Sequence, residues 1–130
     1  MLQAAREAAD TADNPPLLIG VTVLTSISET VLNNELRVPG PVAYHVEQLA
    51  RLSQEAGLDG VVASPHEVTT VANACGPQFV TVIPGVRPRG VDAGDQARIA
   101  TPGEAVQNGA HYLVVGRAIT ASSDPRHAAE

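Results

Sequence analysis

Four runs of apolar residues recur along the chain, and each is followed by a segment with the pattern of a helix. The runs are residues 17–25, 58–63, 79–83 and 112–115. The first run is continuous and not alternating, which is typical of a strand covered on both faces. Four strands that each precede a helix predict an α/β fold of parallel βα units with right-handed crossovers.

The clearest predicted helix covers residues 42–56, where apolar side chains share one stripe and Gly57 occupies the stop position. That stripe consists of Val42, Val46, Leu49, Ala50 and Leu52. Thr101, Pro102 and Glu104 have the spacing of a capping box at the start of another helix. Further helices are predicted at residues 2–12, 28–36 and 66–74, and from Asp124 onward.

Two architectures fit this order of elements. One is a four-stranded open sheet. The other is half of an eight-unit (β/α) barrel, whose typical length of roughly 250 residues is about twice that of this chain. The spacing of apolar residues along the sequence does not distinguish these two architectures.

Polar residues follow every apolar run: Thr25-Ser26, Ser64-Pro65, residues 84–96 and Gly116-Arg117. Ligands of parallel α/β folds bind at the carboxyl ends of the strands. At the last of these ends, Gly116 allows close approach to the backbone and Arg117 offers a forked cation. Arg87 and Gln96 come from the preceding connection, so the pattern predicts a phosphate site.

Each of these features also has an ordinary structural explanation. Gly-Arg pairs after strands occur by chance, and Pro84-Gly85 is typical of a turn. The long connection over residues 86–100 is typical either of a functional lid or of a disordered segment. Asp59 precedes a strand, at the end opposite to ligand sites, and is interpreted as a turn residue.

Composition narrows the possible chemistry. The sequence has no lysine, so its eight basic residues are all arginines, which bind oxyanions but do not donate protons near neutral pH. A net charge of −6 and the scarcity of aromatic residues argue against a nucleic-acid partner. Cys75 is the single cysteine, and the four histidines lack metal-ligand spacing, so they are interpreted as solvated or capping residues and no metal is expected.

The amino-terminal residues 1–13 lack the apolar run of a signal peptide, and no stretch approaches the length of a membrane span. We therefore expect a cytoplasmic chain without a membrane partner.

Four segments, in this order and spacing, resemble the C-terminal half of bacterial orotidine 5′-phosphate decarboxylases. They are LLIGVTVLTS at residues 17–26, GLDGVVAS at 57–64, PGVRP at 84–88 with GDQ at 94–96 and Arg98-Ile99, and VVGRAIT at 114–120. The resemblance implies a TIM barrel of which residues 1–130 form one partial domain, roughly the last four βα units. It also implies a homodimer that converts orotidine monophosphate to uridine monophosphate and CO2 without a cofactor.

Transferred by matching position, the resemblance implies that Thr25 touches the pyrimidine. Gln96 would lie on a mobile loop that closes over phosphate and base, with Arg87 on its approach, and Gly116 and Arg117 would hold the phosphate. The family's catalytic Asp-x-Lys-x-x-x-x-Asp arrangement is absent. The chain is therefore expected to bind substrate but to be inactive alone, and to pair with itself or with a separate N-terminal half-barrel. The alternatives are a non-catalytic phosphate-binding or assembly module, or half of another phosphate-binding barrel enzyme.

Overall fold

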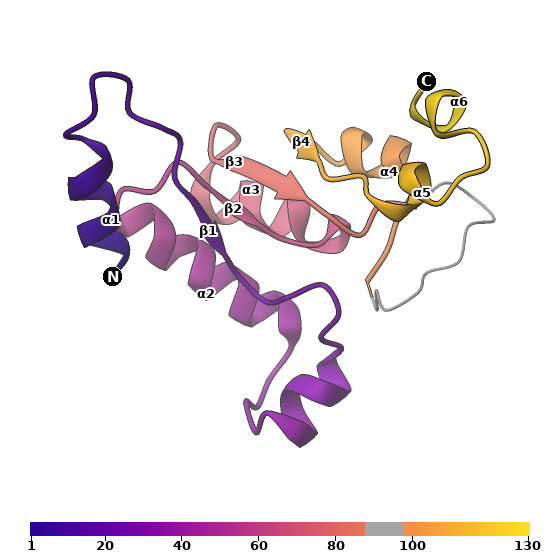
Figure 1. Ribbon diagram of the computed structural model, residues 1–130. Coiled ribbons are helices and arrows are strands. Elements are labelled where there is room, and N and C mark those ends of the chain that lie inside the picture. Colours follow the sequence, from indigo (N-terminus) through magenta and orange to yellow (C-terminus); the bar gives the residue numbers. More distant parts are fainter. Residues whose placement is uncertain (88–97) are drawn as a thin grey trace.

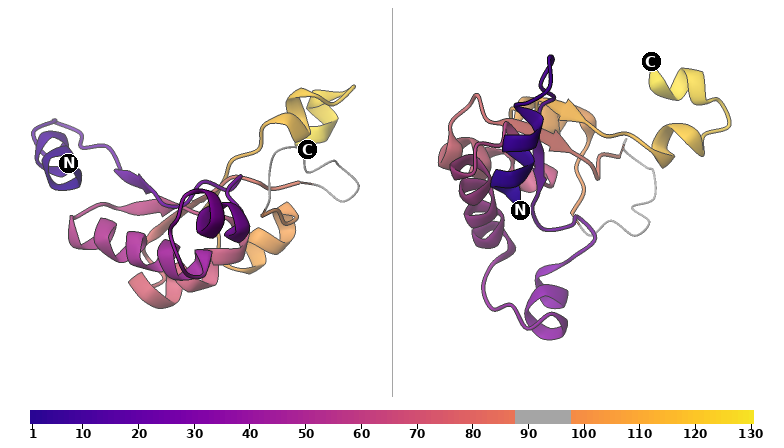
Figure 2. Two further views of the ribbon diagram at one scale, coloured as in Figure 1. Left: turned by 90° about the horizontal axis from the view of Figure 1, so that it is seen from below. Right: turned by 60° about the vertical axis from the view of Figure 1, so that its left-hand side comes forward.

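A four-stranded parallel sheet forms the centre of the molecule in the computed structural model, which describes residues 1–87 and 98–130 (Figure 1). The strands lie in chain order, β1 (Ile19–Val21), β2 (Gly60–Val62), β3 (Val80–Ile83) and β4 (Tyr112–Leu113). A doubly wound open sheet would reverse its strand order and carry helices on both faces. Here the order does not reverse, and α2, α3 and α4 lie on the same side of the sheet (Figure 2). The arrangement is that of half a barrel.

Apart from α5, which was not predicted as a separate helix, the helices begin close to the predicted positions. They are α1 (Leu2–Ala9), α2 (Val42–Glu55), α3 (Val68–Cys75), α4 (Pro102–Gln107), α5 (Arg117–Thr120) and α6 (Pro125–Ala129), with a π-helix at Val31–Glu35 and a 3-10 turn at Pro65–Glu67. None of the helices within the described residues is long and apolar enough to cross a membrane. The strands are shorter than the apolar runs, since only three residues of the run at 17–25 belong to β1.

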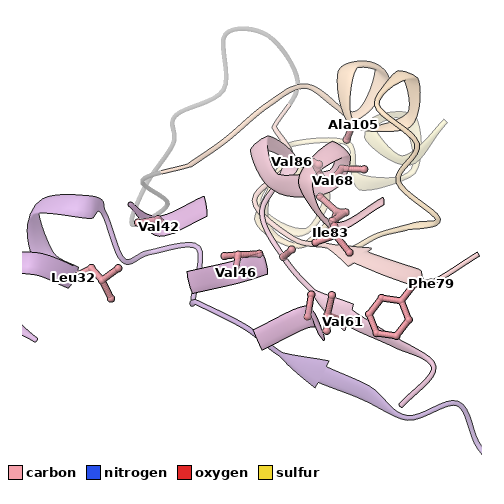
Figure 3. Packing of buried hydrophobic residues seen from close by; sticks show 12 residues of the cluster. Leu32, Val42, Val46, Val61, Val68, Phe79, Ile83, Val86 and Ala105 are labelled. Atoms are coloured by element: carbon pink, nitrogen blue, oxygen red, sulfur yellow. The ribbon is translucent and has the colours of Figure 1, made fainter. Parts of the chain in front are cut away.

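The hydrophobic core fills the space between the helices and the outer face of the sheet (Figure 3). Val61 and Ile83 from the strands are fully buried against Val46 of α2 and against Val68 and Val71 of α3. These side chains occupy alternate strand positions, as expected when one sheet face is covered by helices. The core therefore rests on aliphatic side chains.

The predicted stripe of α2 is correct in part. Val42, Val46 and Ala50 are buried, whereas Leu52 is exposed and Ser53 is buried in its place. The reason is the close approach of α2 to β1: a Cβ on Gly20 would lie 2.7 Å from Ser53 Oγ. A small hydroxyl, which here donates to the Leu49 carbonyl at 2.8 Å, fits that gap where a leucine does not.

Glycine is required at two further positions. A Cβ on Gly60 would lie 2.1 Å from the Val80 carbonyl oxygen, so only glycine lets β2 and β3 pair at this point. Gly57 has a φ of 83° and ends α2, which confirms its predicted stop position.

Capping residues begin three of the helical segments. The Thr101 hydroxyl accepts the Glu104 N–H, and the Glu104 carboxylate accepts the Thr101 N–H at 2.8 Å, which confirms the predicted capping box. Asp124 accepts the His127 N–H at the start of α6. Ser64 and Glu67 form a second capping box that the sequence interpretation did not include.

Side chains also connect elements at the amino end of the sheet. Asp59 accepts the Leu18 N–H at 2.7 Å and the Arg6 guanidinium at 3.1 Å, so it joins α1 to the sheet. His111 accepts the Thr81 N–H at Nδ1 and returns its own N–H to Thr81 Oγ1, both at 3.2 Å. His111 is exposed, which agrees with the expectation of a solvated histidine, and its hydrogen bonds with Thr81 also connect the start of β4 to β3.

The inner face of the sheet carries an in-register apolar row, which consists of Val21, Val62, Val82 and Tyr112. These residues alternate with the core positions along each strand, so their side chains lie on the face away from the helices. Val21 is 62% exposed and Tyr112 57% exposed. In a closed barrel this face is the interior, and β1 and β4 pair with further strands.

Candidate functional site

The carboxyl ends of the four strands bring most of the predicted site residues to one edge of the sheet. β1 leads to Thr25, β3 to Arg87, and β4 to Gly116 and Arg117. Parallel pairing directs all four strands the same way, so these residues share the edge at which barrel enzymes bind ligands. Gln96, Gly94 and Asp95 lie outside the described residues.

Thr25 lies in a tight turn immediately after β1. The Ile27 N–H donates to the Leu24 carbonyl at 2.9 Å, which places Thr25 and Ser26 at the centre of a β-turn. The Thr25 residue is buried, with 8% of its surface exposed. Its position is therefore set by the backbone of residues 23–27.

Arg87 is also buried, at 8% exposure, which is unusual for a guanidinium. Its Nη1 donates to the Val86 carbonyl at 2.8 Å, and its backbone N–H donates to the Ala100 carbonyl at 2.9 Å. Val86 and Ala100 form an isolated parallel bridge at the same point. The cation therefore lies at the base of the connection between β3 and α4. Gly85, two residues earlier, has a φ of 77°, a backbone conformation that favours glycine.

Gly116 and Arg117 form the corner between β4 and α5. Gly116 is the N-cap of α5, and a Cβ at this position would meet no atom of the described residues within 4 Å, so these residues leave the corner open to an incoming group. The helix has only four residues, so its aligned peptide dipoles contribute less to anion binding than a long helix would. Arg117 is the charged element of the corner.

One network at this edge was not predicted from the sequence. Glu67 is buried at 4% exposure, and its Oε1 accepts a hydrogen bond from Arg98 Nη1 at 2.6 Å. Arg98 Nη2 donates to the carbonyls of Val23 and Leu24, both at 3.1 Å. The spacing Ser64-x-x-Glu67 is a capping-box signal that could have identified the carboxylate, but nothing local in the sequence indicates its partner.

Other chemically reactive groups do not add to the site. Burial raises the pKa of the Cys75 thiol, with a smaller opposing effect of Arg51, and the residue ends α3 at the opposite end of the sheet. Within the described residues, no group of three or more His, Cys, Asp or Glu side chains could hold a metal ion. An open cavity of about 510 Å³ lies beside Gly20 and Val21, and it is lined by α1 and α2 residues instead of site residues.

Strands in chain order, helices on one face and polar residues at the carboxyl ends define half of a TIM barrel. The whole chain, residues 1–130, matches the orotidine 5′-phosphate decarboxylase / HUMPS family. The chain belongs to this family and corresponds to the C-terminal half of its barrel.

Individual relatives agree with this assignment. Orotidine 5′-phosphate decarboxylase of Moorella thermoacetica is 53% identical over 134 residues, which cover 99% of this chain and 53% of the relative. The Syntrophotalea carbinolica enzyme is 56% identical over 118 residues, covering 91% of this chain and 48% of the relative. A crystal structure of the Lactobacillus acidophilus enzyme superimposes with a TM-score of 0.78 at 38% identity, covering 98% of this chain and 54% of that one. The chain thus spans about half the length of these relatives.

Proposed function

We propose that this chain is the substrate-binding half of an orotidine 5′-phosphate decarboxylase, which acts in pyrimidine biosynthesis in the cytoplasm. The observation that carries the proposal is the pair of strand-end arginines, Arg87 and Arg117, in a family member without any lysine. Arginine can hold an anionic substrate. It cannot deliver the proton that decarboxylation requires, because a guanidinium keeps its proton at neutral pH.

Each predicted site residue has a role in this proposal. Arg117 and Gly116 hold the phosphate at the open corner, and Arg87 supports the same anion from the adjacent strand end. Thr25 contacts the pyrimidine, and Gln96 reaches both parts of the nucleotide. Orotidine monophosphate is the substrate and uridine monophosphate the product, with no cofactor. The catalytic carboxylates and lysine come from an N-terminal half-barrel.

Substitution of Arg117 tests the phosphate site. Uridine monophosphate should bind the chain weakly, with a Kd of about 1 mM. Arg117→Ala should lower that affinity by roughly 10-fold or more, because one charge-assisted hydrogen bond contributes about 1.5–3 kcal/mol. Isothermal titration calorimetry or NMR titration measures both constants.

Arg126→Ala is the matched control, since Arg126 lies on the next helix with its side chain 91% exposed. It should change the affinity by less than about twofold, as expected of a solvated charge. Equal losses in both variants would mean diffuse attraction to arginines and would refute the assignment of the phosphate site.

A second candidate function, assembly, is favoured by the uncovered inner face. The row Val21, Val62, Val82 and Tyr112 and the free edges of β1 and β4 are apolar or unpaired surfaces that a closed barrel buries. The chain should therefore associate with itself or with an N-terminal half-barrel.

Sedimentation velocity tests this association. The purified chain should sediment as a dimer or larger species at micromolar concentration, and Val82→Glu should shift it toward monomer by placing a charge within the apolar row. Thr69→Glu, at an exposed position on α3, is the control. A compact monomer for the parent chain would contradict the assembly function.

A further inference from the structure

Glu67 and Arg98 form a buried ion pair that joins two distant parts of the chain. The contact of 2.6 Å connects the turn after β2 to the residues before α4, and the two side chains are 5% and 11% exposed. Charges are removed from water at this depth only at a considerable cost in free energy. The single hydrogen bond between Glu67 and Arg98 would not offset that cost. The other hydrogen bonds of both side chains therefore contribute to keeping the charges buried.

Within the described residues, the other hydrogen bonds of Arg98 lie at the end of β1. Its Nη2 donates to the carbonyls of Val23 and Leu24 at 3.1 Å each. The same Leu24 carbonyl accepts the Ile27 N–H and so closes the turn that has Thr25 at its centre. Arg98 therefore fixes two consecutive peptide groups directly before Thr25.

The remaining contacts of Glu67 lie at the end of β2. Its Oε2 accepts the Ser64 N–H at 3.0 Å and also the Ser64 hydroxyl. Backbone pairing between β1 and β2 ends with the Thr22 N–H, which donates to the Val62 carbonyl. Beyond that point, the Ser64–Glu67–Arg98 chain of hydrogen bonds connects the two strand ends.

We propose that Glu67 and Arg98 are positioning residues that hold the turn at residues 23–27, and thereby Thr25, in the geometry that the pyrimidine end of the nucleotide requires. This inference rests on the proposed function. The pair acts at β1 and β2, whereas Arg117 follows β4 at the other edge of the sheet. The pair therefore governs contact with the base and leaves phosphate binding unchanged.

Two NMR measurements on the full chain test the proposal. The first is the hydrogen-exchange rate of the Ile27 amide, which reports the closure of the turn. Arg98→Met should raise it at least about tenfold, the equivalent of one charge-assisted hydrogen bond. The second is titration with uridine monophosphate: the response of the Thr25 amide should be lost, while that of the Arg117 amide should remain.

Arg98→Lys separates positioning from stability. Lysine keeps the charge beside Glu67 but lacks the planar fork that reaches a carboxylate and two carbonyls together. This variant should regain most of the thermal stability lost in Arg98→Met and still exchange the Ile27 amide rapidly. Arg51→Met, which removes the exposed pair with Glu47 on α2, should leave both NMR signals as in the parent chain.

The outcomes are distinguishable. Unchanged Ile27 exchange in the Arg98 variants, or an equal loss of the Thr25 and Arg117 responses, would overturn the proposal. If Arg98→Met does not fold, Arg98→Lys and Glu67→Gln test the proposal by the same two measurements, the Ile27 exchange rate and the amide responses to uridine monophosphate. If the parent chain itself shows no response to uridine monophosphate, the proposed function fails, and the Ile27 exchange rate still decides whether the pair holds the turn.

Discussion

Purified alone, the chain is expected to show no measurable decarboxylation of orotidine monophosphate. The departing CO2 leaves a carbanion that must be protonated, and without lysine the chain lacks the family's acid for this step. Arginine does not substitute because it keeps its proton at neutral pH. The rate should fall at least about 10⁶-fold below that of a typical enzyme-catalysed reaction, to the level of the uncatalysed one. Loss of absorbance by the orotate ring measures it.

Complementation supplies the positive control. The chain, produced in a host without its own decarboxylase, should gain turnover when mixed with an N-terminal half-barrel of a relative that carries the Asp-x-Lys-x-x-x-x-Asp arrangement. Arg117→Ala should reduce this restored activity. Turnover by the chain alone would show that another group supplies the proton, and the division into binding and catalytic halves would be wrong.

Glu67→Ala is expected to lower the free energy of unfolding by about 3–5 kcal/mol, the range measured when one partner of a buried ion pair is removed. Arg98 would keep its charge on a side chain that is only 11% exposed, without a carboxylate beside it. The Ser64 N–H and hydroxyl would lose their acceptor as well. Urea denaturation measures the change against the parent chain.

Glu47→Ala is the matched control, because Glu47 pairs with Arg51 at 3.0 Å on the exposed side of α2. It should cost no more than about 1 kcal/mol, as is usual for surface pairs. If Glu67→Ala prevents folding, the double variant Glu67→Ala/Arg98→Met should recover part of the stability, since no buried charge is then left alone. A cost for Glu67→Ala equal to that of Glu47→Ala would contradict the burial argument.

Sequence patterns predicted the location of the four strands in the described part of the chain and of most helices, because each strand lies within an apolar run. They overestimated strand length at β1, where the run at residues 17–25 continues past the last paired residue, Val21. The excess has a physical cause. Residues 23–27 leave the sheet to form a turn whose carbonyls accept hydrogen bonds from Arg98, a contact across 75 and 74 residues of sequence.

The positions of the candidate site residues could also be predicted from the sequence. Because the strands are parallel, residues directly after them had to share one edge, so the placement of Thr25, Arg87, Gly116 and Arg117 followed from topology. The hydrogen-bond partners of the buried polar groups could not be predicted from the topology. Glu67 and Arg98 are separated by 31 residues and belong to no periodic pattern, so only the three-dimensional structure shows that they meet.

The order of strands has a consequence for how the chain folds. β2 pairs with β3 across the shortest stretch of sequence, from Gly60 to Val80. The pairing of β1 with β2, from Ile19 to Gly60, and of β3 with β4, from Val82 to Tyr112, closes longer loops. The entropic cost of loop closure rises with the length of the loop. The centre of the sheet is therefore the least costly place to nucleate, and the sheet grows outward from it. The edges that remain open in the finished chain are the last parts to form.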